Sequence, residues 1–303
     1  MTRGSHPDLA AAADVGTSAP AGVLPPGLPP APEALPAPTT DAHTHLGSTQ
    51  HFSGLTVADA VAAARAVGVT RLVEVGTDVR SSAEAVALAD SHSGVIACIA
   101  LHPNDAARAG DALGRELAGI EALIGSSDRL RGIGETGLDY YRTRDDEGKR
   151  RQWESFAAHI GWAKRHDLAL VIHDREAHDD ILAVLDAEGA PPRVMMHCFS
   201  GDAAFARRCL DRGFWLSFPG TVTFKANEAL REAFDVTPDD RLLIETDAPY
   251  LTPMPLRGKP NASYLMPHTV RFLAERRGVD VADLCRLARD NATALFGEWG
   301  EDA

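Results

Sequence analysis

The order of the apolar segments constrains the fold of this chain more than any other feature of the sequence. From residue 40 onward, short apolar runs rich in β-branched residues alternate with longer amphipathic stretches. This alternation is typical of repeated β–α units on a parallel sheet. Eight such units close into a (β/α)₈ TIM barrel of about 250 residues more readily than into an open sheet. The predicted strands are the segment before His43 and residues 71–76, 95–101, 130–135, 168–173, 193–198, 214–218 and 242–246.

Amphipathic patterns between these runs predict the helices of the barrel. Gly68, Gly94 and Gly213 follow three of them, and a glycine commonly ends a helix. A doubly wound sheet of similar element content is the alternative, but no Gly-rich dinucleotide-binding loop follows the early strands. The predicted helices are residues 57–67, 82–90, 116–124, 149–165, 177–187, 203–211 and 228–234, followed by 264–276 and 281–296.

The N-terminal segment differs in composition from the rest. Residues 1–36 are dominated by Ala, Pro and Gly without either period, which predicts a disordered tail before one barrel domain at 37–300. Asp8, Asp14 and the prolines interrupt any secretory signal, and no segment approaches the ~20 apolar residues of a membrane helix. Four widely spaced cysteines suggest neither a disulfide framework nor a zinc knot. We therefore expect a monomer in a reducing cytoplasm.

Ionisable residues lie where the predicted strands end, which is where a TIM barrel carries its chemistry. His43 and His45 are two positions apart, so on an extended segment both point toward the barrel axis. Any one of these residues alone could pack in the core, but burying several together is costly unless they are paired or bind metal. Four imidazoles and two carboxylates suit Zn²⁺, Mn²⁺ or a similar divalent ion better than Ca²⁺. The six are His43, His45, Glu135, His173, His197 and Asp247.

Charge limits how a nucleic acid substrate could bind. The balance of 30 Lys plus Arg against 43 Asp plus Glu gives a net charge of −13. Broad electrostatic attraction to nucleic acid is therefore disfavoured, and a phosphate must be captured locally.

Cys198 follows His197 on a predicted strand, so it should face the helices and act in packing, whereas Glu245 should face inward. The candidate substrate-binding residues, each of which could instead be a loop or packing residue, are His102, Tyr140, Arg142 and Lys225.

Five motifs give this chain a specific resemblance. It resembles the TatD family of metal-dependent deoxyribonucleases from about residue 40 to residue 297, which leaves only the N-terminal tail outside. The motifs are Thr40-Asp41-Ala42-His43-Thr44-His45, Leu101-His102-Pro103, Gly132-Ile133-Gly134-Glu135-Thr136-Gly137-Leu138-Asp139-Tyr140, His197-Cys198-Phe199-Ser200-Gly201 and Ile244-Glu245-Thr246-Asp247-Ala248-Pro249-Tyr250-Leu251.

The resemblance implies a site with two divalent metal ions, Mg²⁺, Mn²⁺ or Zn²⁺. One ion would be held by His43, His45 and Asp247, the other by His173 and His197, with Glu135 shared between them. The implied reaction is hydrolysis of phosphodiester bonds in DNA, single-stranded or at a 3′ end, by 3′–5′ exonuclease action. Two metals would activate the water, and Asp247 could take its proton.

Three other functions stay open at the level of the sequence. Amidohydrolases on the same barrel often use a carbamylated lysine on the fourth strand, and no lysine lies between Asp128 and Tyr140. Ester cleavage by a D-aminoacyl-tRNA deacylase would use the same activated water. A barrel that binds nucleotides without turnover would be favoured by loss of a metal ligand, and none of the six is missing.

Overall fold

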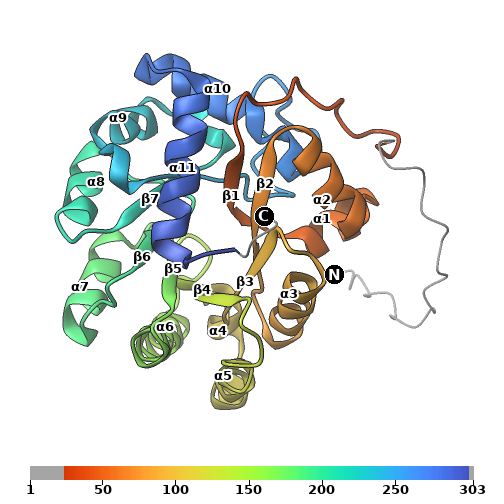
Figure 1. Ribbon diagram of the computed structural model, residues 1–303. Helices are drawn as coiled ribbons and strands as arrows, with labels where there is room; N and C mark the ends of the chain where they lie inside the picture. The colour runs from red at the N-terminus through yellow and green to blue at the C-terminus, as the bar shows by residue number, and fades with distance from the viewer. Residues whose placement is uncertain (1–23, 300–303) are drawn as a thin grey trace, which may run out of the picture.

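The computed structural model describes residues 24–299, which form a barrel of parallel strands surrounded by helices (Figure 1). Each strand pairs with the next in sequence, in the order β1 to β8. A parallel bridge between Thr44 and Ala248 joins the first strand to the segment after the last. The predicted TIM barrel is therefore confirmed. Its strands are β1 Thr39–Thr44, β2 Val69–Val75, β3 Val95–Ile99, β4 Leu130–Asp139, β5 Ala169–Arg175, β6 Val194–Met196, β7 Trp215–Phe218 and β8 Leu242–Ile244.

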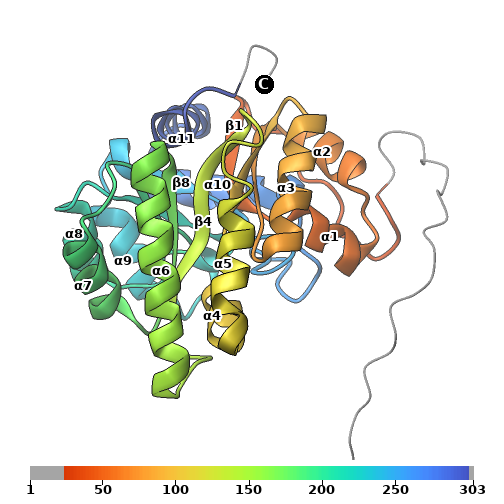
Figure 2. The ribbon, with the colours of Figure 1, turned by 90° about the horizontal axis from the view of Figure 1, so that it is seen from below.

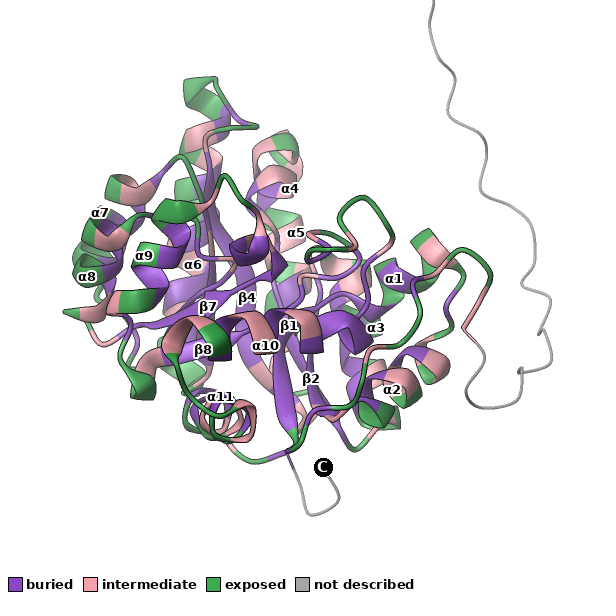
Figure 3. Ribbon diagram, turned by 90° about the horizontal axis from the view of Figure 1, so that it is seen from above, coloured by how far each residue is buried: buried purple, intermediate pink, exposed green. Residues whose placement is uncertain are grey.

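The helices cover the outside of the barrel. Seen from below, α6, α5 and α3 stand side by side along β4 and its neighbours (Figure 2). Buried residues fill the strands and the inner helix faces, while exposed residues lie on the outer helix faces (Figure 3). The helices are α1 Leu46–Ser53, α2 Val57–Ala66, α3 Val79–Ser91, α4 Pro103–Arg108, α5 Leu113–Glu121, α6 Asp146–His166, α7 His178–Glu188, α8 Ala203–Leu210, α9 Glu228–Val236, α10 Met266–Arg277 and α11 Val281–Phe296.

Alternation along the strands separates two apolar clusters. On β5, Leu170 and Ile172 pack in the larger cluster between strands and helices, whereas Val171 belongs to the cluster inside the barrel. His173 follows Val171 by two positions and so points inward as well. The interior cluster fills the barrel beneath the strand ends, so polar side chains at those ends have an apolar floor.

Strand lengths differ from the prediction in ways that matter for the site. β4 extends four residues beyond Glu135, because Asp139 still pairs with Arg175 of β5. β6 and β8 are shorter than predicted, so His197 and Asp247 lie beyond the strand ends. No residue pattern predicted α1 and α4, two short helices that begin soon after β1 and β3.

Part of the predicted tail contacts the barrel. Residues 1–23 lie outside the described residues, but Leu35 is buried in the main core and its amide donates to the Val67 carbonyl over 2.9 Å. The Tyr264 hydroxyl donates to the Pro29 carbonyl over 2.7 Å. The segment from residue 24 to 36 is therefore attached to the domain, through contacts that a Pro-rich composition does not reveal.

Within residues 24–299, we find no helix that is both long enough and apolar enough to span a bilayer.

Candidate metal centre

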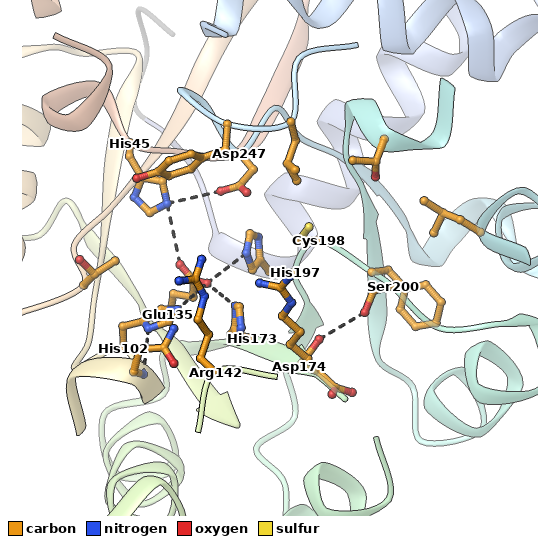
Figure 4. Close-up of a pocket in the computed structure, with 18 of the residues that line it drawn as sticks. His45, His102, Glu135, Arg142, His173, Asp174, His197, Cys198, Ser200 and Asp247 are labelled. Carbon is orange, nitrogen blue, oxygen red and sulfur yellow. Dashed lines mark hydrogen bonds and ion pairs between the residues drawn. The ribbon is translucent and has the colours of Figure 1, made fainter. Parts of the chain in front are cut away.

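All six predicted metal ligands converge at the carboxyl ends of the strands. Figure 4 shows His45, Glu135, His173, His197 and Asp247 around one centre. Parallel strands finish at the same end of the barrel, so residues far apart in sequence meet there. Glu135 lies on β4 and His173 on β5, whereas His197 and Asp247 follow β6 and β8. The arrangement agrees with the sequence prediction in placing the six side chains together.

The Glu135 carboxylate lies at the centre of this group, with its two oxygens directed at different histidines. Oε2 is 3.6 Å from His43 Nε2 and 3.8 Å from His45 Nε2. Oε1 is 2.6 Å from His173 Nδ1 and 3.3 Å from His197 Nε2. A carboxylate whose oxygens face two separate sets of nitrogens has the geometry of a bridging ligand.

On the side of Glu135 Oε2, His43 and His45 also lie close to each other and to Asp247. His43 Nε2 lies 3.3 Å from His45 Nε2, and Asp247 Oδ1 lies 3.5 Å from His45 Nε2. His43 and His197 stack with their ring centroids 3.6 Å apart. Two ring nitrogens directed at each other need a proton or a cation between them, because two lone pairs repel.

Oxygen atoms on the far side of two rings orient their inner nitrogens. His45 Nδ1 lies 2.8 Å from the Val75 carbonyl oxygen, which can only accept. His197 Nδ1 lies 3.0 Å from Glu245 Oε1. In both neutral rings Nδ1 therefore carries the proton and Nε2 presents a lone pair to the centre, as metal-ligating histidines do.

His102 has the opposite tautomer. Its Nδ1 accepts the Asn104 amide proton over 3.0 Å at the start of α4, so in the neutral ring Nε2 carries the hydrogen. That Nε2 lies 3.3 Å from Glu135 Oε1, as close as His197 Nε2. The predicted assignment of His102 to substrate rather than metal fits this tautomer, because its inner nitrogen carries a hydrogen rather than a free lone pair.

Asp139 lies behind His173 and was not predicted as a site residue. Its Oδ2 is 3.4 Å from His173 Nε2, so Nδ1 of that ring faces Glu135. Asp139 is buried, and its carboxylate also accepts from Asn104 Nδ2 over 3.1 Å and from the Arg142 amide over 2.8 Å. The extension of β4 beyond Glu135 is what brings this carboxylate to the site.

Opposed charges shift the pKa values of the cluster. Burial would raise the pKa of Glu135, but the neighbouring His102 and His197 hold it well below its usual range. Burial would lower the pKa of His45, but its hydrogen bond to Asp247 and the nearby carboxylates raise it to about 9. For His173, burial is likewise outweighed, by Asp139 and Glu135, and the pKa rises to about 9. Without a cation the carboxylates thus retain protons on the imidazoles, and a divalent ion can replace those protons.

The first strand and the segment after the last strand are joined by a buried aspartate. Asp41 Oδ1 accepts from the Thr246 amide over 2.9 Å, and Oδ2 accepts from the Thr246 hydroxyl over 2.6 Å. The Asp247 amide donates to the His43 carbonyl over 3.0 Å. These bonds fix the positions of His43 and Asp247 relative to each other.

A cavity of about 800 Å³ opens above the centre, within the range of small-molecule sites. Arg142, a predicted substrate-binding residue, lines it, and so do Arg108 and Arg175, which the sequence did not single out. Arg175 Cζ lies 3.9 Å from the centroid of the Tyr141 ring, a contact that holds the guanidinium at the cavity wall. The cavity therefore places cations around a centre that is itself rich in carboxylates.

Two predicted substrate-binding residues do not line this cavity. The Tyr140 hydroxyl donates to Asp180 over 2.7 Å and accepts from the Trp153 indole over 2.7 Å, so the ring packs against α6 and α7. Lys225 is exposed in the loop after β7, beside the lining residue Ala226 but not among the lining residues. Neither position supports a direct role.

The prediction that Cys198 faces the helices is wrong. β6 ends at Met196, and Cys198 has φ of 44°, so strand alternation no longer applies there. Its side chain lines the cavity beside His197 (Figure 4). Burial raises the pKa of the Cys198 thiol well above its usual range, and Asp247 and Glu245 add to the effect. The thiol is therefore held protonated, which makes it a poor ligand.

Comparisons with known proteins decide the family. A model described as "TatD related DNase" matches residues 40–297. A Mycobacterium tuberculosis protein named "Uncharacterized metal-dependent hydrolase TatD" is 44% identical over 260 residues, covering 85% of this chain and 97% of that protein. The chain belongs to the TatD family. It is thus a TatD-type metal-dependent hydrolase.

Two further TatD relatives add an activity name and a structure. A Cronobacter sakazakii protein named "3'-5' ssDNA/RNA exonuclease TatD" is 35% identical, covering 78% of this chain and 90% of that protein. The crystal structure of the Escherichia coli TatD homologue YJJV superposes with a TM-score of 0.75 at 26% identity, covering 86% of this chain and 98% of that one.

The donor set of this TatD protein fits divalent ions. His43 Nδ1 and Glu245 Oε2 are buried without a hydrogen-bond partner among the described residues, and every ion pair that Glu135 makes there is with an imidazole. Imidazole and carboxylate are the ligands that zinc and manganese accept. A buried carboxylate surrounded by imidazoles, as Glu135 is, is therefore consistent with bound metal.

Sequence reasoning missed Arg175, although a signal was present. It follows His173 by two positions on β5, so strand alternation alone places it on the same face. Tyr250, also a lining residue, was not predicted as a site residue either. Both lie on the wall of the cavity rather than at its metal-binding floor.

Proposed function

We propose that this protein is a phosphodiesterase that removes nucleotides from the 3′ end of single-stranded DNA, using two divalent metal ions. The observation that carries the proposal is the orientation of Glu135, with Oε2 toward His43 and His45 and Oε1 toward His173 and His197. Two such half-sites sharing one carboxylate suit two ions. The exonuclease name of the Cronobacter relative supports the choice of substrate.

The proposed assignment of ligands follows the two sides of Glu135. His43, His45 and Asp247 would hold one ion, and His173 and His197 the other, with Glu135 shared. Ions held by these residues would lower the pKa of a water and neutralise charge on the phosphate as it builds in the transition state. Mg²⁺, Mn²⁺ and Zn²⁺ are all candidates for this donor set.

Side chains of the protein accept the proton of the attacking water and bind the phosphate. Asp247 Oδ1, at the edge of the cavity, accepts a proton from the attacking water as its oxygen bonds to phosphorus. The bond from phosphorus to the 3′ oxygen of the preceding nucleotide breaks, and that oxygen takes a proton from solvent. His102 Nε2–H and the guanidinium groups of Arg142 and Arg175 donate to the non-bridging oxygens.

The test is cleavage of a single-stranded oligonucleotide by metal-stripped protein, with Mg²⁺, Mn²⁺ or Zn²⁺ added back. A label at the 5′ end should give a ladder of shortening products, and a label at the 3′ end should appear at once as a mononucleotide. Asp247→Asn should abolish both. Asp211→Asn, which changes an exposed aspartate outside the cavity, should cleave like the wild type.

Other outcomes are equally clear. A ladder from the 3′ label would reverse the polarity of the proposed reaction. If no phosphodiester is cleaved but aminoacyl esters or amides are hydrolysed with metal, and Asp247→Asn abolishes that hydrolysis, the metal centre stands and the proposed substrate is wrong.

A further inference from the structure

Two exposed aromatic rings lie together at the edge of the cavity. Phe52, on α1, is 67% exposed, and Tyr250, in the segment after β8, is 50% exposed. Their ring centroids are 6.4 Å apart at 69°, an edge-to-face contact. Tyr250 lines the cavity. A single exposed ring needs no explanation, but a contacting pair beside a reaction centre marks a surface that binds something apolar.

The Tyr250 ring is held close to the metal centre. Its centroid lies 6.4 Å from that of His45. The Tyr250 amide donates to the Asp247 carbonyl over 2.9 Å, and its carbonyl accepts from Asn261 Nδ2 over 2.5 Å. The same amide group of Asn261 donates to the Thr246 carbonyl over 3.0 Å. Because buried Asn261 ties Thr246 and Tyr250 together, the ring keeps a fixed position relative to Asp247.

The aromatic ring is the part of the Tyr250 side chain that makes contacts within the protein. Among the described residues, no hydrogen bond involves the Tyr250 hydroxyl, and the ring makes edge-to-face contacts with Phe52 and His45. The cavity's cations lie elsewhere on its wall, at Arg108, Arg142 and Arg175, where phosphates can bind. The ligand that suits the Tyr250 ring is therefore a neutral, planar group that lies within about one nucleotide of the metal centre.

We propose that Tyr250, supported by Phe52, stacks on the base of the 3′-terminal nucleotide and so determines that the substrate end must be unpaired. The inference rests on the proposed function, since it names how that site holds its substrate. Stacking uses the π-face that every base has, so all four bases are accepted. It also needs no net positive charge, which agrees with binding of DNA by a chain of net charge −13.

The test combines a change in the ring with a change in the substrate. Tyr250→Leu keeps an apolar side chain but loses the aromatic face, and Tyr250→Phe keeps the face but loses the hydroxyl. Each metal-loaded protein is assayed on a single-stranded oligonucleotide and on the same oligonucleotide lacking its 3′-terminal base. Fluorescence anisotropy of the same pairs gives binding independently of cleavage. Phe52→Ala is a second variant at a residue outside the cavity wall.

Loss of stacking should raise KM and the dissociation constant of Tyr250→Leu about tenfold on the intact oligonucleotide, with Tyr250→Phe unchanged. On the baseless oligonucleotide the wild type and Tyr250→Leu should be equal, because there is no base to stack on. An equal loss on both substrates, or no loss on either, would overturn the inference. Failure of every protein to cleave, with base-dependent binding retained, would instead refute the proposed function alone.

Discussion

At the scale of single residues, the partners behind each imidazole decide what it can do. His197 and His102 lie equally far from Glu135 Oε1, yet Glu245 leaves a lone pair on His197 Nε2 whereas the Asn104 amide leaves a hydrogen on His102 Nε2. Metal affinity should therefore depend on carboxylates that do not themselves face the centre.

Glu245→Gln tests this dependence. The amide removes the charge that faces His197 Nδ1, so we expect metal affinity to fall about 10- to 100-fold. Competition with a chromogenic chelator measures the affinity directly. Glu232→Gln, at an exposed position on α9, is the control and should bind metal like the wild type. Unchanged affinity in Glu245→Gln would show that Glu245 has no part in orienting the ring.

The sequence was sufficient to predict the six clustered side chains, because alternation along strands and the common end of parallel strands are general rules. It was insufficient where the backbone leaves the strand. Cys198 and Asp247 both have positive φ, and no residue pattern marks that change. Lys225 and Tyr140 follow strands too, but loop conformation, not strand geometry, decides where such side chains point.

At the scale of elements, the joint between β1 and the segment after β8 holds the two ends of the site together. Thr246→Val removes the hydroxyl that donates to the fully buried Asp41 carboxylate over 2.6 Å. An unsatisfied buried acceptor costs about 1–3 kcal/mol, so the free energy of unfolding in urea should fall by that amount. Thr39→Val is the matched control and should be neutral or stabilising. Thr39 is buried on β1, and within residues 24–299 its hydroxyl has no hydrogen-bond partner. Equal effects of the two substitutions would contradict the role of the joint.

The packing of α6 against the end of β3 gives stability a pH dependence. His159 is buried, its Nε2 accepts from the Leu101 amide over 3.0 Å, and burial lowers its pKa to about 4 from an ordinary 6.5. As the pH falls, His159 takes up a proton in the unfolded chain before it does so in the folded chain. The contribution of His159 to stability is therefore complete above pH 6.5 and is lost as the pH falls toward 4. The loss amounts to about 3 kcal/mol.

Urea unfolding at a series of pH values from 4 to 7 checks this expectation. His159→Gln should be less stable at neutral pH but should lack this part of the acid-dependent loss. His51→Gln, at an exposed position on α1, controls for the substitution itself. If His159→Gln retains the full wild-type slope, the loss arises at other groups.

The elements themselves were predictable to the extent that they are long and periodic. The strand and helix order follows from alternating apolar runs, but α1 and α4 are short and follow the site residues His45 and His102. Their starts depend on local contacts: Glu74 Oε2 accepts from the Leu46 amide over 2.6 Å, and His102 caps α4 before Pro103. The first of these contacts joins residues 28 positions apart and forms only once the barrel is folded.

At the scale of the whole molecule, the barrel gathers two carboxylates and four imidazoles over an apolar interior, and that concentration of charge opposes folding unless it is compensated. A divalent ion that binds only the folded chain stabilises it by mass action, by about 2.7 kcal/mol at a concentration of 100 Kd. We expect the Tm of metal-stripped protein to rise by roughly 5–10 °C when Zn²⁺ or Mn²⁺ is restored, and to return on addition of EDTA. Differential scanning fluorimetry measures the shift.

Asp247→Asn, which weakens one half of the site, should show a smaller shift, while Asp211→Asn should match the wild type. A rise of the same size in Asp247→Asn would mean that the ions stabilise the protein from another place.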